Sequence, residues 1–131
     1  MSYLGSPYLI CTPGHINKNA EYACSQFTMH LPKLVSPYEA AWLSTVMFMK
    51  DASRFWVGAK FDPSQTPPSW AWDVDSSTLV PPATADDDYN LWKSEESADP
   101  SGGKACLVLD GGNYVSANCD EVHPFACQFA Q

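Results

Sequence analysis

Cysteine placement constrains this 131-residue chain more than any other feature of its sequence. The five cysteines are Cys11, Cys24, Cys106, Cys119 and Cys127. None belongs to a Cys-x-x-Cys pair, which weighs against structural zinc and thioredoxin-like redox chemistry. An extracellular disulfide framework with one cysteine left over fits better, so we expect a secreted protein. Residues 1–7 lack the basic and apolar regions of a secretory signal, and we expect that signal to lie outside this sequence.

Length and composition indicate a single domain over residues 1–131. The chain is long enough for one hydrophobic core, whereas two domains of half this length would each be marginal. No apolar run approaches the roughly 20 residues that a bilayer requires, so we expect no membrane insertion. Only 7 basic residues stand against 15 acidic ones, giving a net charge of -8. This balance disfavours nucleic acid as a partner, because a phosphate backbone attracts lysine and arginine.

The first half of the chain predicts a short strand and a helix. Residues 8–11 form an apolar run typical of a strand, and Thr12-Pro13-Gly14 should end it with turn chemistry. A helix should follow, because apolar residues then recur with the 3.6-residue period of a helix. Its predicted core face consists of Ile16, Ala20, Ala23, Cys24 and Phe27.

A second helix is predicted to begin at Pro37. Ser36 is placed to cap it, Pro37 suits its first position, and Glu39 completes a capping box. The helix should reach about Lys50. The residues assigned to the core on this helix are Ala40, Leu43, Val46, Met47 and Phe48.

Short strand-like segments dominate the rest of the chain. They occupy residues 55–58, 70–72, 105–109, 113–116 and 124–129. Helices first and strands later indicate an α+β fold, with helices packed on an antiparallel sheet. Between Trp72 and Cys106 the sequence is rich in Pro, Asp, Ser and Gly, and we expect a long irregular loop with a functional role.

Several ordered motifs resemble the C-type lectin-like domains over nearly the whole chain. Phe55-Trp56-Val57-Gly58 resembles the family's WIG-type strand, and Trp70-Ala71-Trp72 resembles its W-x-W turn. Trp92, Cys106, Cys119 and Pro124-Phe125-Ala126-Cys127 follow in the family's order. The resemblance implies two helices packed on antiparallel sheets, a long irregular loop region and two disulfides.

The disulfides implied by the resemblance are Cys24–Cys127 and Cys106–Cys119. Their loops of 103 and 13 residues would contribute about 4.7 and about 3 kcal/mol in the chain-entropy model. Cys11 is left without a mate. It is either a free buried thiol or an intermolecular bridge that would link a homo-oligomer.

The resemblance also implies a set of calcium ligands, and this sequence lacks most of them. Calcium requires six to eight oxygen ligands, which the family supplies from a loop motif, a Glu before one cysteine and a WND triplet. These positions here are Glu96-Ser97-Ala98, Lys104 and Tyr114-Val115-Ser116, and only Glu96 matches. We therefore expect no metal at the family's site and no cofactor. An alternative is calcium held by a rearranged acidic loop, whose candidate ligands are Asp86, Asp87, Asp88, Glu95, Glu96 and Asp99.

The function predicted from these features is non-catalytic recognition of carbohydrate or of a protein surface through the long-loop face. The candidate ligand-binding residues are Trp92, Tyr114, Glu95, Glu96, Asp99, Lys104 and Ser116. Core packing is the alternative role for the two aromatic residues. An assembly protein that oligomerises through this fold is the alternative function. His15, His30 and His123 show no metal-binding spacing, and no nucleophile motif occurs, so we expect no enzyme activity.

Overall fold

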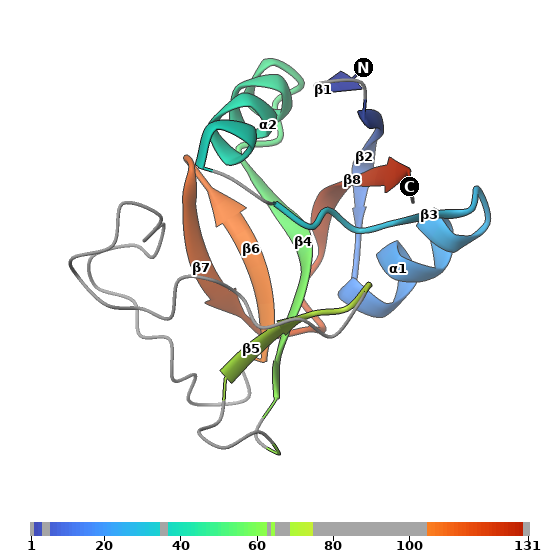
Figure 1. Cartoon of the computed structure of the whole chain (residues 1–131), viewed down its shortest axis with the longest axis vertical. Helices are drawn as coiled ribbons and strands as arrows, with labels where there is room; N and C mark the ends of the chain where they lie inside the picture. The colour runs from blue at the N-terminus through green and yellow to red at the C-terminus, as the bar shows by residue number, and fades with distance from the viewer. Residues whose placement is uncertain are drawn as a thin grey trace.

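Two helices lie on opposite faces of a sheet in the computed structural model (Figure 1). The structure describes residues 2–3, 6–34, 37–62, 64, 69–74 and 105–129. The helices are α1 (Asn17–Ser25) and α2 (Pro37–Met49). The strands are β1 (Ser2–Tyr3), β2 (Ser6–His15), β3 (Met29–His30), β4 (Arg54–Asp62), β5 (Ser69–Trp72), β6 (Cys106–Asp110), β7 (Asn113–Ala117) and β8 (His123–Phe129). The predicted α+β class is confirmed. That residues 1–131 form one domain stays a prediction.

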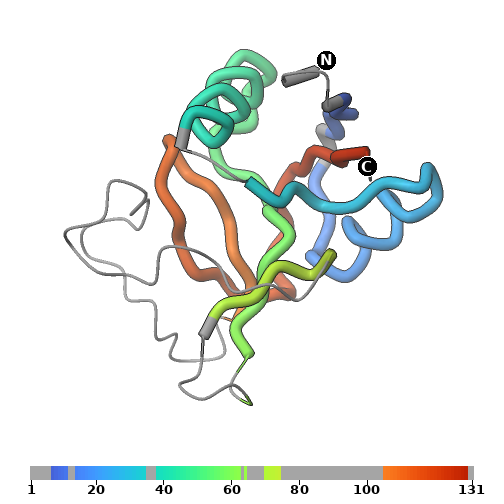
Figure 2. The backbone as a smooth tube through the Cα atoms, in the orientation of Figure 1, coloured from blue at the N-terminus to red at the C-terminus, as the bar shows by residue number. Residues whose placement is uncertain are grey.

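The strands form one sheet in the order β1-β2-β8-β4-β6-β7, with β3 added to β8 and β5 to β4. The pairing is antiparallel, as expected, except for a short parallel contact between β4 and β8 at Trp56 and Phe125. The predicted antiparallel arrangement is therefore confirmed for the sheet as a whole, and this one contact makes the sheet mixed. The parallel contact arises because β8 lies between β2 and β4 and already pairs antiparallel with β2. The first and last long strands therefore run side by side (Figure 2).

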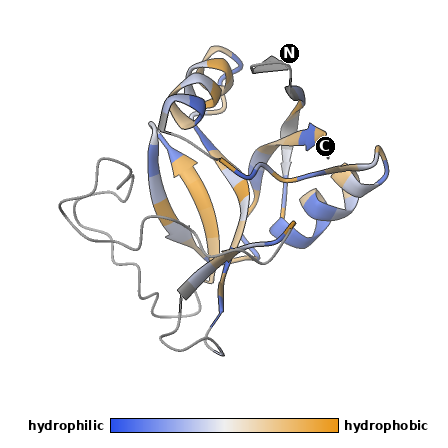
Figure 3. Ribbon diagram, in the orientation of Figure 1, coloured by the Kyte–Doolittle hydropathy of each residue, from blue (hydrophilic) through white to orange (hydrophobic). Residues whose placement is uncertain are grey.

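The central strands are buried on both faces, which explains their nearly continuous apolar sequences. Along β6, Leu107 and Leu109 join the core beneath α2, whereas Val108 joins the core beneath α1. The alternation follows from the period of two in a strand. Figure 3 shows β6 as a hydrophobic element over most of its length. Two separate apolar layers result, one on each side of the sheet.

Both disulfides implied by the family resemblance are confirmed. Cys24 of α1 bonds to Cys127 of β8 across a Cα–Cα distance of 5.4 Å. Cys106 of β6 bonds to Cys119, just beyond β7, across 5.2 Å. The first bond holds α1 against the last strand. The second joins the hairpin of β6 and β7 at the end opposite its turn, where Gly111 and Gly112 adopt positive φ angles.

Several local predictions were wrong. Thr12-Pro13-Gly14 does not end the first strand, because the β2–β8 register shifts between Cys11 and His15 and pairing resumes at His15. An irregularity of this kind accommodates a proline within a strand. Phe27 is 61% exposed because α1 ends at Ser25, before the helical period reaches it. Phe48 is 70% exposed because it lies one helical step, about 100°, beyond the buried Met47.

Most of the remaining helix predictions agree with the structure, but Ile16 precedes α1 as its N-cap residue and is only half-buried. Ala20 and Cys24 are buried on α1, and Ala40, Leu43, Val46 and Met47 are buried on α2. The predicted Ser36 cap lies outside the described residues, and Glu39 is buried and accepts a hydrogen bond of 2.9 Å from the Tyr8 hydroxyl. None of the helices in the described part of the chain has the length and apolar character needed to cross a bilayer.

Candidate functional site

Residues 75–104 join β5 to β6 and contain most of the predicted ligand-binding residues. The chain on either side of this segment is held against β4. On the near side, the Asp73 amide donates a 2.7 Å hydrogen bond to the Gly58 carbonyl. On the far side, the Ala105 carbonyl accepts a 3.0 Å hydrogen bond from the Phe61 amide. Asp73 and Ala105, on either side of the segment, are therefore both fixed to one short stretch of β4 between Gly58 and Phe61.

Gly58 makes this arrangement sterically feasible. The chain at Leu31 and Pro32 crosses β4 there, and the Gly58 amide donates a 2.9 Å hydrogen bond to the Pro32 carbonyl. A Cβ atom at Gly58 would lie 2.7 Å from the Leu31 carbonyl oxygen, closer than real Cβ contacts allow. Glycine therefore allows β4 to contact the 31–32 crossing while also holding the chain after β5.

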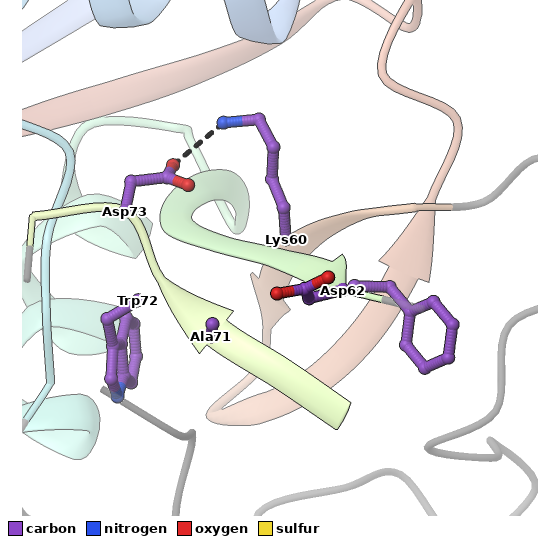
Figure 4. Close-up of a pocket in the computed structure, with 6 residues that line it drawn as sticks. Lys60, Asp62, Ala71, Trp72 and Asp73 are labelled. Atoms are coloured by element: carbon purple, nitrogen blue, oxygen red, sulfur yellow. Dashed lines mark hydrogen bonds and ion pairs between the residues drawn. The ribbon is translucent and has the colours of Figure 1, made fainter. Parts of the chain in front are cut away.

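The hairpin of β4 and β5 carries a pocket of about 290 Å³ next to these anchor points (Figure 4). Its lining residues are Lys60, Phe61, Asp62, Ala71, Trp72 and Asp73. Lys60 pairs with Ala71 across the two strands, so the small side chain of Ala71 leaves space beside the lysine. The pocket lies just below the lower end of the usual range for small-molecule sites, about 300–1,000 Å³. A single small polar group is the size of ligand that it suits.

Lys60 connects three elements at the edge of this pocket. Its Nζ lies 2.8 Å from Oδ2 of Asp73, and Figure 4 shows the two side chains pointing toward each other. The same ammonium forms an ion pair and hydrogen bond with Oε1 of Glu21 on α1. One cation thus bridges α1 and the residue that follows β5. All three side chains are about one third exposed, so water screens the attraction and each pair alone contributes little stability.

The crowding of two carboxylates around one ammonium changes the acidity of the cluster. Burial first, and then the hydrogen bond and negative charge of Glu21, raise the pKa of Asp73 to about 6, despite the opposing effect of Lys60. Burial acts to lower the pKa of Lys60, but its bonds to Asp73 and Glu21 outweigh burial, and the net shift of the pKa is upward. Asp73 therefore changes protonation in mildly acidic solution while Lys60 stays charged.

The pocket offers hydrogen-bonding groups of both polarities. Lys60 donates, whereas the carboxylates of Asp62 and Asp73 accept. Asp62 also orders the turn after β4, because its Oδ1 accepts hydrogen bonds from the Ser64 amide at 2.9 Å and the Ser64 hydroxyl at 2.5 Å. A ligand with several hydroxyl or amide groups is the chemical complement of such a surface.

Two predicted ligand-binding residues lie on β7. Tyr114 is 3% exposed and belongs to the core beneath α2. Burial, and secondarily the negative charge of Glu39, raise the pKa of its phenol. Ser116 is also buried. The position of Tyr114 corresponds to the core-packing alternative, and a ligand contact by either residue stays a prediction.

The other predicted site residues lie outside the described part of the chain. They are Trp92, Glu95, Glu96, Asp99 and Lys104, together with Asp86, Asp87 and Asp88. The structure therefore brings together only the base of the predicted site. Within the described residues, no group of three or more His, Cys, Asp or Glu side chains is placed to hold a metal ion.

Sequence reasoning missed the cluster of Glu21, Lys60 and Asp73. A usable signal exists on β4, where Lys60 and Asp62 alternate with the apolar Ala59 and Phe61 and so mark the side of the hairpin that carries charge. Nothing in the sequence indicates that Glu21, on a helix 39 residues earlier, meets Lys60.

Cys11 is the free cysteine, and partial burial raises the pKa of its thiol.

Comparison with known proteins identifies the family. The model of the C-type lectin domain matches residues 15–129. The human scavenger receptor C-type lectin carbohydrate-recognition domain superimposes with a TM-score of 0.79 and 20% identity, covering 100% of this chain and 95% of that one. The carbohydrate-recognition domain of cow CD23, solved in the presence of a GlcNAc2Man3 oligosaccharide, gives 0.73 and 24%, covering 100% and 93%. Human lithostathine gives 0.73 and 20%, covering 100% and 88%.

The chain belongs to the C-type lectin domain family. A search of curated proteins finds no significant match. Domains of this family are generally non-catalytic recognition modules that bind carbohydrate or protein ligands, are commonly extracellular or lumenal, and often bind Ca²⁺. The described part of the family's calcium position does not fit that ion well. Val115, in place of the Asn of the WND triplet, is apolar and packs in the core beneath α1, and Ser116 offers a hydroxyl where the triplet has a carboxylate.

Proposed function

We propose that this protein is a secreted, non-catalytic recognition module whose ligand binds the face formed by residues 75–104 and the pocket between β4 and β5. One observation carries the proposal. The chain on either side of the 75–104 segment is hydrogen-bonded to β4, beside a pocket with charged groups of both signs. A rigid scaffold that presents a long polar segment is the usual design of a binding site built on loops.

Carbohydrate is the ligand class that we favour. The donors and acceptors of Lys60, Asp62 and Asp73 suit hydroxyl-rich molecules, and Trp92 offers an aromatic ring on which a sugar could stack. Structural neighbours include domains named for carbohydrate recognition, one of them solved with an oligosaccharide. The net charge of -8 argues against polyanionic ligands such as nucleic acid. A protein surface is the second ligand class.

We further propose that recognition does not depend on calcium at the family's position. Val115 and Ser116 lack the carboxamide and carboxylate of the WND triplet, and Lys104 places an ammonium where a carboxylate would be needed. If calcium binds at all, the acids of the 75–104 segment must supply the ligands in another arrangement.

A glycan array probed with the purified domain, with and without a calcium chelator, tests both parts of the proposal. We expect glycan binding that survives chelation and falls at least tenfold with Trp92→Ala. Tyr22→Ala is the matched control, because Tyr22 is an exposed aromatic residue on α1. Loss of binding on chelation would contradict the calcium-independent site. Binding that Trp92→Ala leaves unchanged would place the ligand elsewhere on the molecule.

Calorimetry with CaCl₂ tests the remaining alternative, in which the acidic segment binds calcium in a rearranged site. A calcium-independent site predicts no saturable heat. A saturable heat that disappears in the Glu95→Ala, Glu96→Ala double variant, and persists in the Asp120→Ala variant of an exposed acid near Cys119, would show a rearranged calcium site in the acidic segment.

A further inference from the structure

Helix α2 carries an exposed face without charged side chains. The residues of this face, called the α2 outer face, are Tyr38, Ala41, Trp42, Thr45, Phe48 and Met49. Tyr38, Phe48 and Met49 are 77%, 70% and 73% exposed, while Trp42 packs partly against Tyr8. In Figure 1, α2 lies at the margin of the molecule. Three large apolar side chains thus face solvent on a single helix.

The spacing of the outer face is that of a helix built to contact another helix. Tyr38 and Thr45, Ala41 and Phe48, and Trp42 and Met49 are each seven residues apart. Repeats of seven keep one stripe of a helix facing a partner. The opposite side of α2 already buries Ala40, Leu43 and Met47 against the sheet. A helix that is apolar on both sides is normally covered on both sides.

Charge favours a second copy of this chain as the partner. Two copies with a net charge of -8 each repel one another over most of their surfaces. The α2 outer face avoids this repulsion, because Glu39, the only charged residue of the helix, is buried on its other side beside Tyr8. Anionic membranes would be repelled by the same net charge, and the outer face lacks the lysines and arginines of helices that bind them.

The sizes of the side chains select an antiparallel arrangement. Small residues, Ala41 and Thr45, lie in the middle of the face beside Trp42, which packs against Tyr8. The most exposed large side chains, Tyr38, Phe48 and Met49, lie at its two ends. A two-fold axis near the middle of the helix would place Tyr38 against the partner's Met49, an aromatic–sulfur contact that is favourable. The small residues at the axis would let the two helices approach closely. We propose that the α2 outer face is a self-association surface through which two copies of this chain pair as antiparallel helices.

The area of the face sets the strength expected of this dimer. Tyr38, Phe48 and Met49 together expose on the order of 400 Å², given about 150–250 Å² for a large side chain. This area is typical of a functional surface patch but is about half of the roughly 800 Å² that each partner buries in a stable complex. The dimer should therefore be weak and concentration-dependent. It requires no bond at Cys11 and no ligand at the recognition face.

Sedimentation velocity of the Cys11→Ala protein from micromolar to millimolar concentration tests the proposal. We expect a monomer–dimer equilibrium whose Kd rises at least tenfold with Phe48→Glu and with Thr45→Glu, because each places like charges near the two-fold axis or against apolar side chains. Val122→Glu is the control, since Val122 is 65% exposed just before β8. A protein that stays monomeric throughout, or a Kd that Phe48→Glu changes no more than Val122→Glu does, would overturn the proposal.

Cross-linking then tests the orientation. In the Cys11→Ala protein, oxidised glutathione should join a Tyr38→Cys copy to a Met49→Cys copy, with two thiols oxidised and glutathione disulfide reduced. Neither variant should cross-link efficiently to itself. Efficient Tyr38→Cys homodimers would exclude the antiparallel arrangement. Co-sedimentation of the monomer with phosphatidylcholine vesicles that is lost in Phe48→Glu would identify lipid as the occupant and would also overturn the proposal.

Discussion

The two faces of the sheet are each covered by a helix, but the two helices are held in place in different ways. Beneath α2 the core is a continuous apolar layer in which Leu43 and Met47 meet side chains of β4 and β6. Beneath α1 both disulfides take part, and the residues of α1 that are buried are only Asn17, Ala20 and Cys24. A helix that buries two small residues and one amide gains little from the hydrophobic effect. The comparison indicates that packing holds α2, whereas a covalent bond holds α1.

Removal of the Cys24–Cys127 bond should have the largest effect. The Cys24→Ala, Cys127→Ala double variant is expected to lose roughly 4–5 kcal/mol of unfolding free energy, because the bond closes a loop of 103 residues. Urea denaturation measures the loss. The Cys106→Ala, Cys119→Ala variant is the matched comparison, with about 3 kcal/mol expected from its shorter loop. An equal or smaller loss for the Cys24–Cys127 pair would contradict the inference that this bond holds α1 against the sheet.

Truncation of the α2 core should cost somewhat less. Leu43→Ala removes a fully buried side chain and is expected to reduce the unfolding free energy by about 2–5 kcal/mol. Phe48→Ala on the same helix removes an exposed ring and should change stability by no more than about 0.5 kcal/mol. Chemical denaturation of both variants gives the comparison. Similar losses for the two would mean that α2 is not held by its inner face.

Replacement of Asn17, a buried residue of α1, should raise the free energy of unfolding. Its side chain is 1% exposed, and neither its Nδ2 nor its Oδ1 has a hydrogen-bond partner in the structure. Asn17→Leu fills nearly the same space without an unpaired polar group, so we expect a gain of roughly 1 kcal/mol in unfolding free energy. Asn19→Leu, at an exposed position on the same helix, should be nearly neutral. A loss of stability in Asn17→Leu would show that a buried water pairs with the amide.

The smallest effect is expected from the Lys60 cluster. The pKa of Asp73 lies above its ordinary value of 3.8, at about 6, so the folded state binds this proton more tightly than the unfolded state. The stabilising contribution of protonated Asp73 is therefore complete below about pH 3.8 and is lost as the pH rises through about 6. In Asp73→Asn the free energy of unfolding should no longer show this decrease between pH 4 and pH 7, as measured by denaturation at each pH. Asp120→Asn should retain the wild-type profile, and an unchanged profile in Asp73→Asn would contradict the assignment.

Sequence reasoning succeeded where a pattern determines structure locally or where the family fixes a covalent bond. The helical period placed Cys24 in the core, and the family resemblance then supplied its partner, Cys127. It failed where three-dimensional packing decides. The continuation of β2 through Pro13 depends on pairing with β8, more than 100 residues later. Phe48 satisfies the apolar pattern of a core residue, although the sheet covers only one side of α2.

The candidate site was predicted less completely than the fold. The family resemblance indicated the segment before Cys106, and the structure describes only the chain on either side of it, where Asp73 and Ala105 are hydrogen-bonded to β4. Neither propensity nor spacing could indicate that Lys60 reaches both Glu21 and Asp73, because long side chains meet through tertiary contacts. Such contacts leave no periodic trace in the sequence.

The neighbouring β2 and β8 give the molecule a particular response to mechanical load. Because these strands are antiparallel, a pull applied to both ends of the chain would separate them one hydrogen bond at a time, starting near Tyr8 and Gln128. The Cys24–Cys127 bond would then carry the tension directly from α1 to the last strand. The covalent bond would thereby shield residues 25–126 from the tension while the chain on either side of it is stretched.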